Sequence, residues 1–186
     1  MFPVDRFSEI SIEQMTDTRI PKERYFRNRA RGNKSPYFMI ALTTPPLPYA
    51  EHMEVSAQIE SYEGELEIFT LENPIVSLTA FTNKNVNATY LAGVKSLVIT
   101  GSHAFRVGDL IQFDNHSKVY RISSVVRTTN TTVGISCPLV ESINSATDLL
   151  YGANVVFQVC LNSSYSQEID AKSKFGVVDV ELIEQA

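Results

Sequence analysis

Residues 101–126, GSHAFRVGDLIQFDNHSKVYRISSVV, carry the pattern that decides the fold class. Two short runs rich in apolar residues, Asp109–Phe113 and Val119–Val126, flank the polar turn Asp114–Lys118. Runs of this length, bounded by Gly, Asp and Asn, predict two strands joined by a hairpin turn. We expect the apolar side chains of this hairpin to form a core, namely Leu110, Ile111, Phe113, Val119, Tyr120 and Ile122.

Similar short strands are predicted on both sides of this hairpin. Ser96–Thr100, Thr132–Cys137 and Asn154–Leu161 are rich in apolar residues and are separated by turn residues. Five short strands at this spacing are typical of a small SH3-like or OB-like barrel. We therefore expect residues 91–160 to form a small β-barrel module, with a short helical turn at 138–146.

The rest of the chain predicts a second β-rich unit with one helix. Pro48 precedes a run of good helix formers and Gly64 follows it, which predicts a helix over residues 48–63. Further strands are expected at residues 7–15, 37–42, 65–71 and 174–184. The predicted fold class is mainly β, a β-rich α+β fold. In it, residues 1–90 and 161–186 form a β-sandwich with one flanking helix.

The predicted helix carries two apolar stripes. Tyr49, Met53 and Ala57 fall on one side of a helical wheel, and Val55, Ile59 and Tyr62 fall on another. One stripe is expected to pack on a sheet while the other contacts a partner, and we expect Val55, Ile59 and Tyr62 at a subunit interface.

Two charged segments have opposite signs. Residues 19–34 contain seven Lys or Arg and one Glu, whereas residues 51–72 contain seven Glu and no Lys or Arg. Such patches suit contact between copies of one protein, since each can meet its opposite on a neighbour. The alternative is two solvated faces that never meet. The predicted subunit-interface residues are Arg24, Arg27, Arg29, Arg31, Glu51, Glu54, Glu60 and Glu63.

Composition excludes several classes of protein. The 186 residues are 44% hydrophobic, which is too apolar for a disordered chain, and the net charge of −5 argues against general nucleic-acid binding. No apolar run approaches the ~20 residues that span a bilayer, and MFPVDRFSEI lacks the features of a signal peptide. Cys137 and Cys160 are expected to be reduced and buried in a reducing cytoplasm, although their spacing also permits one disulfide.

The sequence contains no recognisable catalytic or metal-binding motif. His52, His103 and His116 lie far from each other and from the cysteines, and CxxC, HExxH, GxSxG, P-loop and GxGxxG patterns do not occur. His116 beside Asp114 could be a metal-binding or acid–base fragment, but a polar hairpin turn is favoured. We therefore expect no enzyme activity, no catalytic residue, no metal and no cofactor.

The stretch 101–126 resembles a recurrent element of tail-tip and baseplate proteins of tailed bacteriophages. The order of the other elements is similar too: a basic strand, a Pro-containing break, a helix, ELEIF, and later ISCPL, VVFQVCL and VDVELIE. The chain is most similar to distal tail proteins, which form a ring between the tail tube and the tip.

This resemblance implies a structural role. It implies a six-fold homo-oligomeric ring that contacts tail tube and tip or hub proteins, with a second β module inserted into or appended to the ring domain. The location implied is the virion tail, assembled in the host cytoplasm. Because the work of the family is assembly, no catalytic, metal-binding or cofactor-binding residue is carried over, and no membrane partner is expected.

Two other readings remain open. One is a carbohydrate- or receptor-binding β module of a phage tail, although the chain has no Trp and only its eight Tyr could serve as aromatic platforms. The other is a small hydrolase. A ring in solution would favour the structural role, whereas a monomer that binds glycan would favour the second reading.

Overall fold

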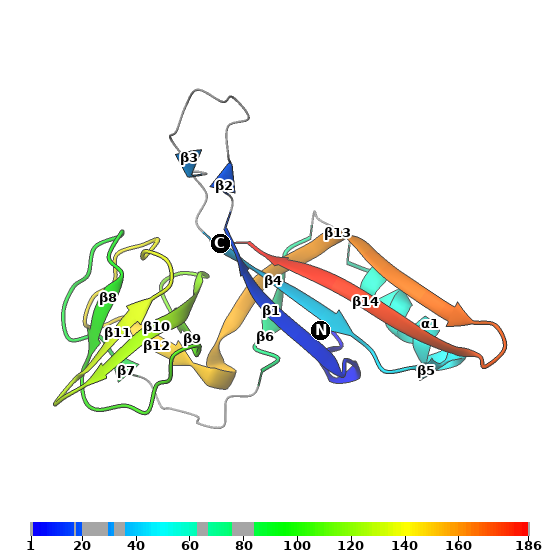
Figure 1. Ribbon diagram of the computed structural model, residues 1–186, viewed down its shortest axis with the longest axis horizontal. Helices are drawn as coiled ribbons and strands as arrows, with labels where there is room; N and C mark the ends of the chain where they lie inside the picture. Colours follow the sequence, from blue (N-terminus) through cyan, green and yellow to red (C-terminus); the bar gives the residue numbers. More distant parts are fainter. Residues whose placement is uncertain are drawn as a thin grey trace.

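The computed structural model describes residues 2–16, 18–19, 30–31, 36–62, 67–75 and 84–185, with only the backbone at 18–19, 30–31, 84 and 163–165. In these parts the fold consists of two six-stranded antiparallel sheets, a two-stranded ladder and the α-helix α1, Tyr49–Glu60 (Figure 1). The predicted mainly β class with one helix is confirmed.

The first sheet combines the beginning and the end of the chain. Its strand order is β1-β4-β14-β13-β6, and the short β5 also pairs with β14. β14 is central because it pairs with β4 on one side and with β13 on the other. The strands are β1 (Glu9–Met15), β4 (Tyr37–Thr43), β5 (Leu47–Pro48), β6 (Phe69–Glu72), β13 (Val156–Asp170) and β14 (Phe175–Glu184).

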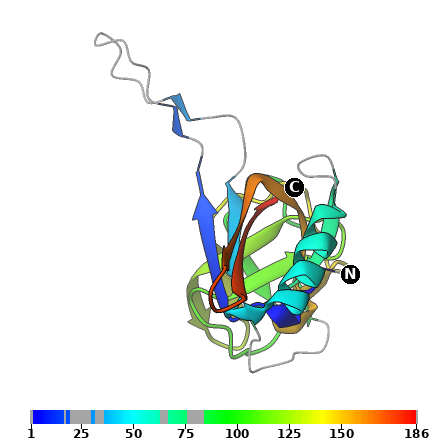
Figure 2. The same cartoon turned by 90° about the vertical axis from the view of Figure 1, so that its right-hand side faces the viewer.

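One face of the first sheet is covered by α1 (Figure 2). Val178, Val180 and Leu182 alternate along β14 toward this inner face and are buried with Val55 and Ile59 of α1. The helix thus occupies the place that a second sheet would take in a sandwich. We call the first sheet with α1 and the 3-10 turn η1 (Val4–Arg6) the first module.

Of the two apolar stripes of α1, the one predicted to lie at a subunit interface is buried and the other is exposed. Val55 and Ile59 are 3% and 0% exposed, and the ring of Tyr62 packs 4.4 Å from that of Phe69. The stripe predicted for a subunit interface is therefore part of the protein's own core, which corrects that expectation. Tyr49 and Met53 are the exposed pair, at 53% and 44%.

The second sheet, which we call the second module, curls on itself. Its edge strands β7 and β8 meet through one isolated bridge, Val86↔Ile99, with a hydrogen bond on each side, so the sheet is barrel-like but not a closed barrel. Its order is β7-β12-β9-β10-β11-β8. The strands are β7 (Lys84–Asn85), β8 (Ser96–Ile99), β9 (Leu110–Phe113), β10 (Val119–Arg127), β11 (Thr131–Ile135) and β12 (Asp148–Tyr151).

Several boundaries differ from those expected. β12 was not predicted, and residues 138–146 contain no helix, although the Thr147 N–H donates to the Asn144 carbonyl oxygen and closes one turn there. β7 begins before residue 91, and β13 joins the first sheet at Val156 and continues to Asp170. Its polar end, 166–170, is exposed throughout, so it lacks the alternation that marks a half-buried strand, and pairing with β14 alone holds it extended.

The predicted hairpin core is divided between the two modules. Ile111, Phe113, Tyr120 and Ile122 are buried in the second module, as expected. Leu110 and Val119 are instead buried in the core of the first module. Successive side chains of a strand point to opposite faces, and β9 is buried on both faces because the first module covers its outer one.

The side chain of His52 fixes how α1 lies on the sheet. This fully buried imidazole packs directly over Gly176, so that a Cβ at position 176 would lie 2.3 Å from His52 Cδ2. Glycine is therefore required at position 176 by close approach of the helix rather than by backbone conformation.

We predict that Gly176→Ala destabilises the fold by about 1–3 kcal/mol, because the added methyl group overpacks the interface between α1 and β14. In a His52→Ala background the same change is expected to cost at least about 1 kcal/mol less, since the imidazole is gone. Urea denaturation of the wild type, the two single variants and the double variant measures these free energies of unfolding. Equal costs in both backgrounds would show that His52 does not impose the requirement.

Candidate functional site

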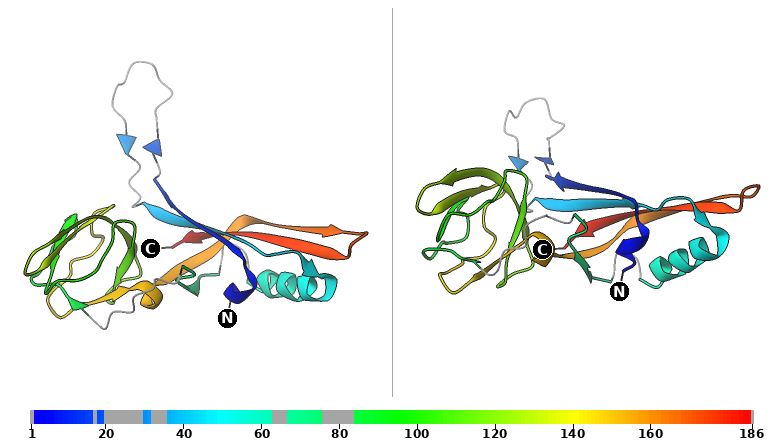
Figure 3. Two further views of the ribbon diagram at one scale, coloured as in Figure 1. Left: turned by 60° about the horizontal axis from the view of Figure 1, so that its bottom comes forward. Right: turned by 90° about the horizontal axis from the view of Figure 1, so that it is seen from below.

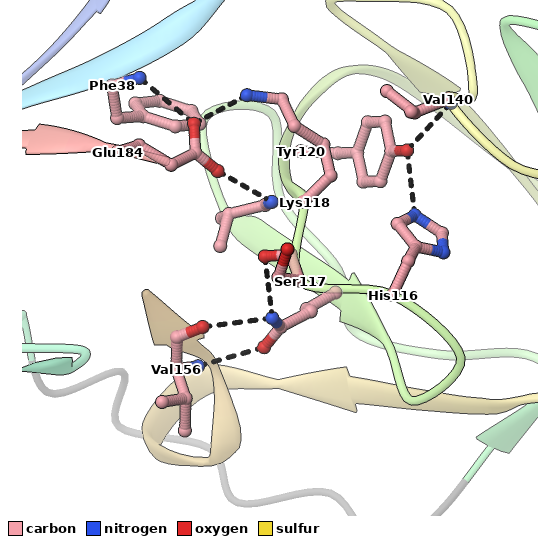
Figure 4. Close-up of polar contacts among 10 residues, drawn as sticks. Phe38, His116, Ser117, Lys118, Tyr120, Val140, Val156 and Glu184 are labelled. Atoms are coloured by element: carbon pink, nitrogen blue, oxygen red, sulfur yellow. Dashed lines mark hydrogen bonds and ion pairs between the residues drawn. The ribbon is translucent and has the colours of Figure 1, made fainter. Parts of the chain in front are cut away.

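The junction between the two modules is built around the buried carboxylate of Glu184 (Figure 4). Glu184 is the last residue of β14 and is 3% exposed. It accepts hydrogen bonds from Lys118 Nζ at 2.5 Å, from the Val119 N–H at 2.9 Å and from the Phe38 N–H at 3.0 Å. One carboxylate thus joins β4 and β14 of the first module to the start of β10 in the second.

Two cations lie beside the same aromatic ring. Lys118 Nζ is 5.7 Å and Arg121 Cζ is 5.4 Å from the centroid of Phe38. Arg121 also donates from Nη2 to the carbonyl oxygen of Ile12 in β1, at 2.9 Å. Burial of a charge is costly unless it is paired and hydrogen-bonded, and here the lysine and the carboxylate satisfy each other.

Gln112 joins the modules a second time. Its side-chain amide donates from Nε2 to the carbonyl oxygens of Ser117 and Val156, and its Oε1 accepts from the Val156 N–H, each at 2.9 Å. The amide thus pairs with the first residue of β13 as a neighbouring backbone would. These part-buried contacts and the buried ion pair together hold the two modules against each other.

His116 lies in the predicted hairpin turn, where both of its ring nitrogens have hydrogen-bond partners. Its Nε2 lies 2.8 Å from the Tyr120 hydroxyl, which already accepts from the Val140 N–H, and its Nδ1 lies 2.9 Å from Asn115 Oδ1. In the neutral imidazole protonated on Nδ1, the Nδ1–H donates to Asn115 Oδ1 and Nε2 accepts from the Tyr120 hydroxyl. Burial lowers the pKa of His116 below its ordinary 6.5, although Glu141 and Asp114 oppose this shift.

Two shallow hollows lie on the described surface. One, of about 280 Å³, lies over β4, β13 and β14. The other, of about 350 Å³, lies beside the 114–117 turn and includes Leu150 and Gln158. Within the described ranges no three His, Cys, Asp or Glu side chains come close enough to hold a metal ion, and no helix is long and apolar enough to cross a membrane.

Only part of the predicted subunit interface can be placed. Arg24, Arg27, Arg29 and Glu63 lie outside the described residues, and Arg31 is known only by its backbone in β3 (Ala30–Arg31). Glu51, Glu54 and Glu60 are exposed on α1, where Glu51 pairs with Arg6 at 3.4 Å.

The basic and acidic segments do not meet where the structure describes them. β2 (Thr18–Arg19) and β3 form a narrow arm that projects beyond both modules, and α1 lies away from it (Figures 1 and 3). A contact between Arg31 and α1 within one chain is therefore excluded by the arrangement of these elements.

Sequence reasoning missed the junction residues Gln112, Lys118, Arg121 and Glu184. One signal was available, because Glu184 continues the period-two series of Val178, Val180 and Leu182 on the buried face of the last strand. A carboxylate at such a position needs a buried partner, but the pattern does not say which cation supplies it.

Neither a family model nor a curated protein sequence matches this chain. The functional argument therefore depends on the geometry of the described residues and on their charges.

We predict that Lys118→Met destabilises the fold by about 3–5 kcal/mol, because it leaves the buried carboxylate of Glu184 without its cation. Arg6→Met, which breaks the exposed pair with Glu51, is the matched control and is expected to cost less than about 1 kcal/mol. The double variant Lys118→Met/Glu184→Gln should be more stable than the sum of its single changes predicts. Urea denaturation tests this, and similar small costs for Lys118→Met and Arg6→Met would contradict it.

We also predict that His116 makes the fold sensitive to acid. Its pKa is lower in the folded than in the unfolded chain, so the unfolded chain binds more protons near pH 6 and stability falls as the pH drops through 6.5. Between about pH 7.5 and 5.5, the wild type should lose more free energy of unfolding than His116→Gln, which retains His52 and His103. Parallel losses would show that His116 does not contribute.

Proposed function

We propose that this protein is a structural component of a bacteriophage tail tip or baseplate, where copies form a ring that joins the tail tube to the tip or hub proteins. The observation that carries this proposal is the combination of a two-module body, joined by a buried ion pair, with a projecting arm. Contacts of Glu184 and Gln112 hold the body together, and β2–β3 projects from it between the end of β1 and the start of β4 (Figure 3).

The distribution of charge favours contact between copies. The arm belongs to a segment with seven basic residues and one acid, whereas the chain as a whole has a net charge of −5. Since the arm projects from the body, its charge is available to a neighbour, and opposite charges favour a defined orientation of two copies. The proposal assigns no catalytic step to any residue.

The second candidate is carbohydrate or receptor binding by the second module. It is favoured by the hollow beside the 114–117 turn, which presents the polar side chains of Asp114, Asn115, Ser117 and Gln158. However, the ring of Phe113 in its lining is fully buried, so it offers no aromatic platform to a sugar.

We predict that the purified protein forms rings visible by electron microscopy, and that Arg27→Glu/Arg29→Glu/Arg31→Glu abolishes them. Each exposed pair contributes only about 0.2–1 kcal/mol, but reversing three charges removes several contacts and adds repulsion at every interface. Mass photometry measures the loss of the oligomer.

The matched control is Lys95→Glu/Arg106→Glu/Lys172→Glu, which makes the same change in net charge at exposed positions outside the arm. This control is expected to assemble as the wild type does. A wild type that stays monomeric at all concentrations, and binds glycan instead, would overturn the ring proposal in favour of the second candidate.

A further inference from the structure

In the described parts of the chain, no helix or strand covers the outer face of the first sheet, opposite α1 (Figure 2). The strand register places side chains of β1, β4 and β14 on it in rows. Glu9, Thr43 and Asp179 form one row, Ser11, Ala41 and Glu181 the next, and Glu13, Met39 and Ile183 a third. Four carboxylates therefore surround a half-buried apolar centre.

This face is unusual in its charge. The six strands of the first sheet contain eight Asp or Glu and no Lys or Arg. On the outer face, Asp179 accepts from Thr43 Oγ1 at 2.6 Å and Glu181 accepts from Asn162 Nδ2 at 2.9 Å, and both donors are neutral. In the described parts of the chain, neither carboxylate has a cationic partner.

The face is also hollowed where these carboxylates lie. The 280 Å³ hollow is lined by Ala41, Thr43, Ser166, Asp179 and Glu181, among others. It lies beside the register shift of β13 between Leu161 and Tyr165. An extended segment can therefore lie in this hollow, against the apolar centre and between the carboxylates.

The chain itself provides a segment of matching charge and spacing. Seven of its sixteen Lys and Arg lie within residues 19–34. Residues two apart on an extended chain lie about 6.5–7 Å from each other on one face, as Asp179 and Glu181 do on β14. Arg29 and Arg31 have the same separation in sequence, and Arg31 belongs to the extended strand β3.

We propose that the basic segment 19–34 of a second copy docks in this hollow, with Arg29 and Arg31 paired to Asp179 and Glu181. This inference rests on the proposed function and deepens it. It places the surface that binds the basic segment on the outer face of the first sheet instead of on α1. The donor is a second copy because β3 of the same chain lies beyond the ends of β1 and β4, apart from the middle of β14 (Figures 1 and 3). On α1, by contrast, Glu51 is already paired with Arg6.

The experiment measures binding of a fluorescent peptide of residues 19–34 to the full chain, beside the oligomeric state of the same proteins. Asp179→Asn/Glu181→Gln should weaken peptide binding at least tenfold and weaken assembly to a similar extent. Glu51→Gln/Glu54→Gln, which removes the same charge from α1, should change both by less than twofold. Thermal unfolding checks that each variant is folded.

A charge swap gives a second test that does not depend on loss alone. Arg29→Glu/Arg31→Glu and Asp179→Lys/Glu181→Lys should each fail to assemble, but an equimolar mixture should assemble into rings of alternating subunits. Each arm in the mixture then meets an outer face of opposite charge.

The outcomes separate the two proposals. If the wild type forms rings but the hollow variant binds the peptide and assembles normally, the docking inference is overturned and the ring stands. If the wild type associates into dimers or open chains rather than rings, and the hollow variant loses both this association and peptide binding, the ring proposal is overturned and the docking inference stands. If only Glu51→Gln/Glu54→Gln loses peptide binding, the basic segment binds α1 and the inference is overturned.

Discussion

The buried ion pair between Lys118 and Glu184 is the constraint on which the arrangement of the molecule depends. Both side chains are almost fully excluded from solvent, at 2% and 0%, so neither can lose its partner without leaving a charge in a dry interior. We infer that the pair contributes to the specificity of this arrangement. It permits one relative placement of the two modules, and Gln112 and Arg121 add directional hydrogen bonds that agree with it.

This junction explains why β9 and β10 serve two cores. Along β9 and residues 119–122 of β10, side chains alternate between the second module and the first, and apolar residues occur on both faces because both faces are covered there. Beyond residue 122, β10 is largely exposed. The first sheet is built in the opposite way. α1 covers one of its faces, and the other retains carboxylates beside a half-buried apolar centre, which is the composition of a surface that receives a partner.

The proposed assembly follows from this asymmetry. A body whose modules are joined by a buried ion pair presents its surfaces in one arrangement. In the proposed assembly, the projecting arm and the acidic face of the sheet are each satisfied by neighbours in a regular array. The exposed stripe of Tyr49 and Met53 is a separate surface. It does not contribute to the docking argument, because no charge or geometry in the structure indicates its partner.

The sequence by itself determined the elements whose signal is local. Short apolar runs bounded by turn residues located β4 and β10, and period-two alternation located β14. The proline before a run of helix formers located α1. Only the tertiary structure decided that Leu110 and Val119 join the other core, that residues 166–170 continue β13, and that Lys118 pairs with Glu184. These features depend on contacts between residues far apart in the chain, such as the 66 residues that separate the ion pair, and no local pattern records which distant surfaces meet.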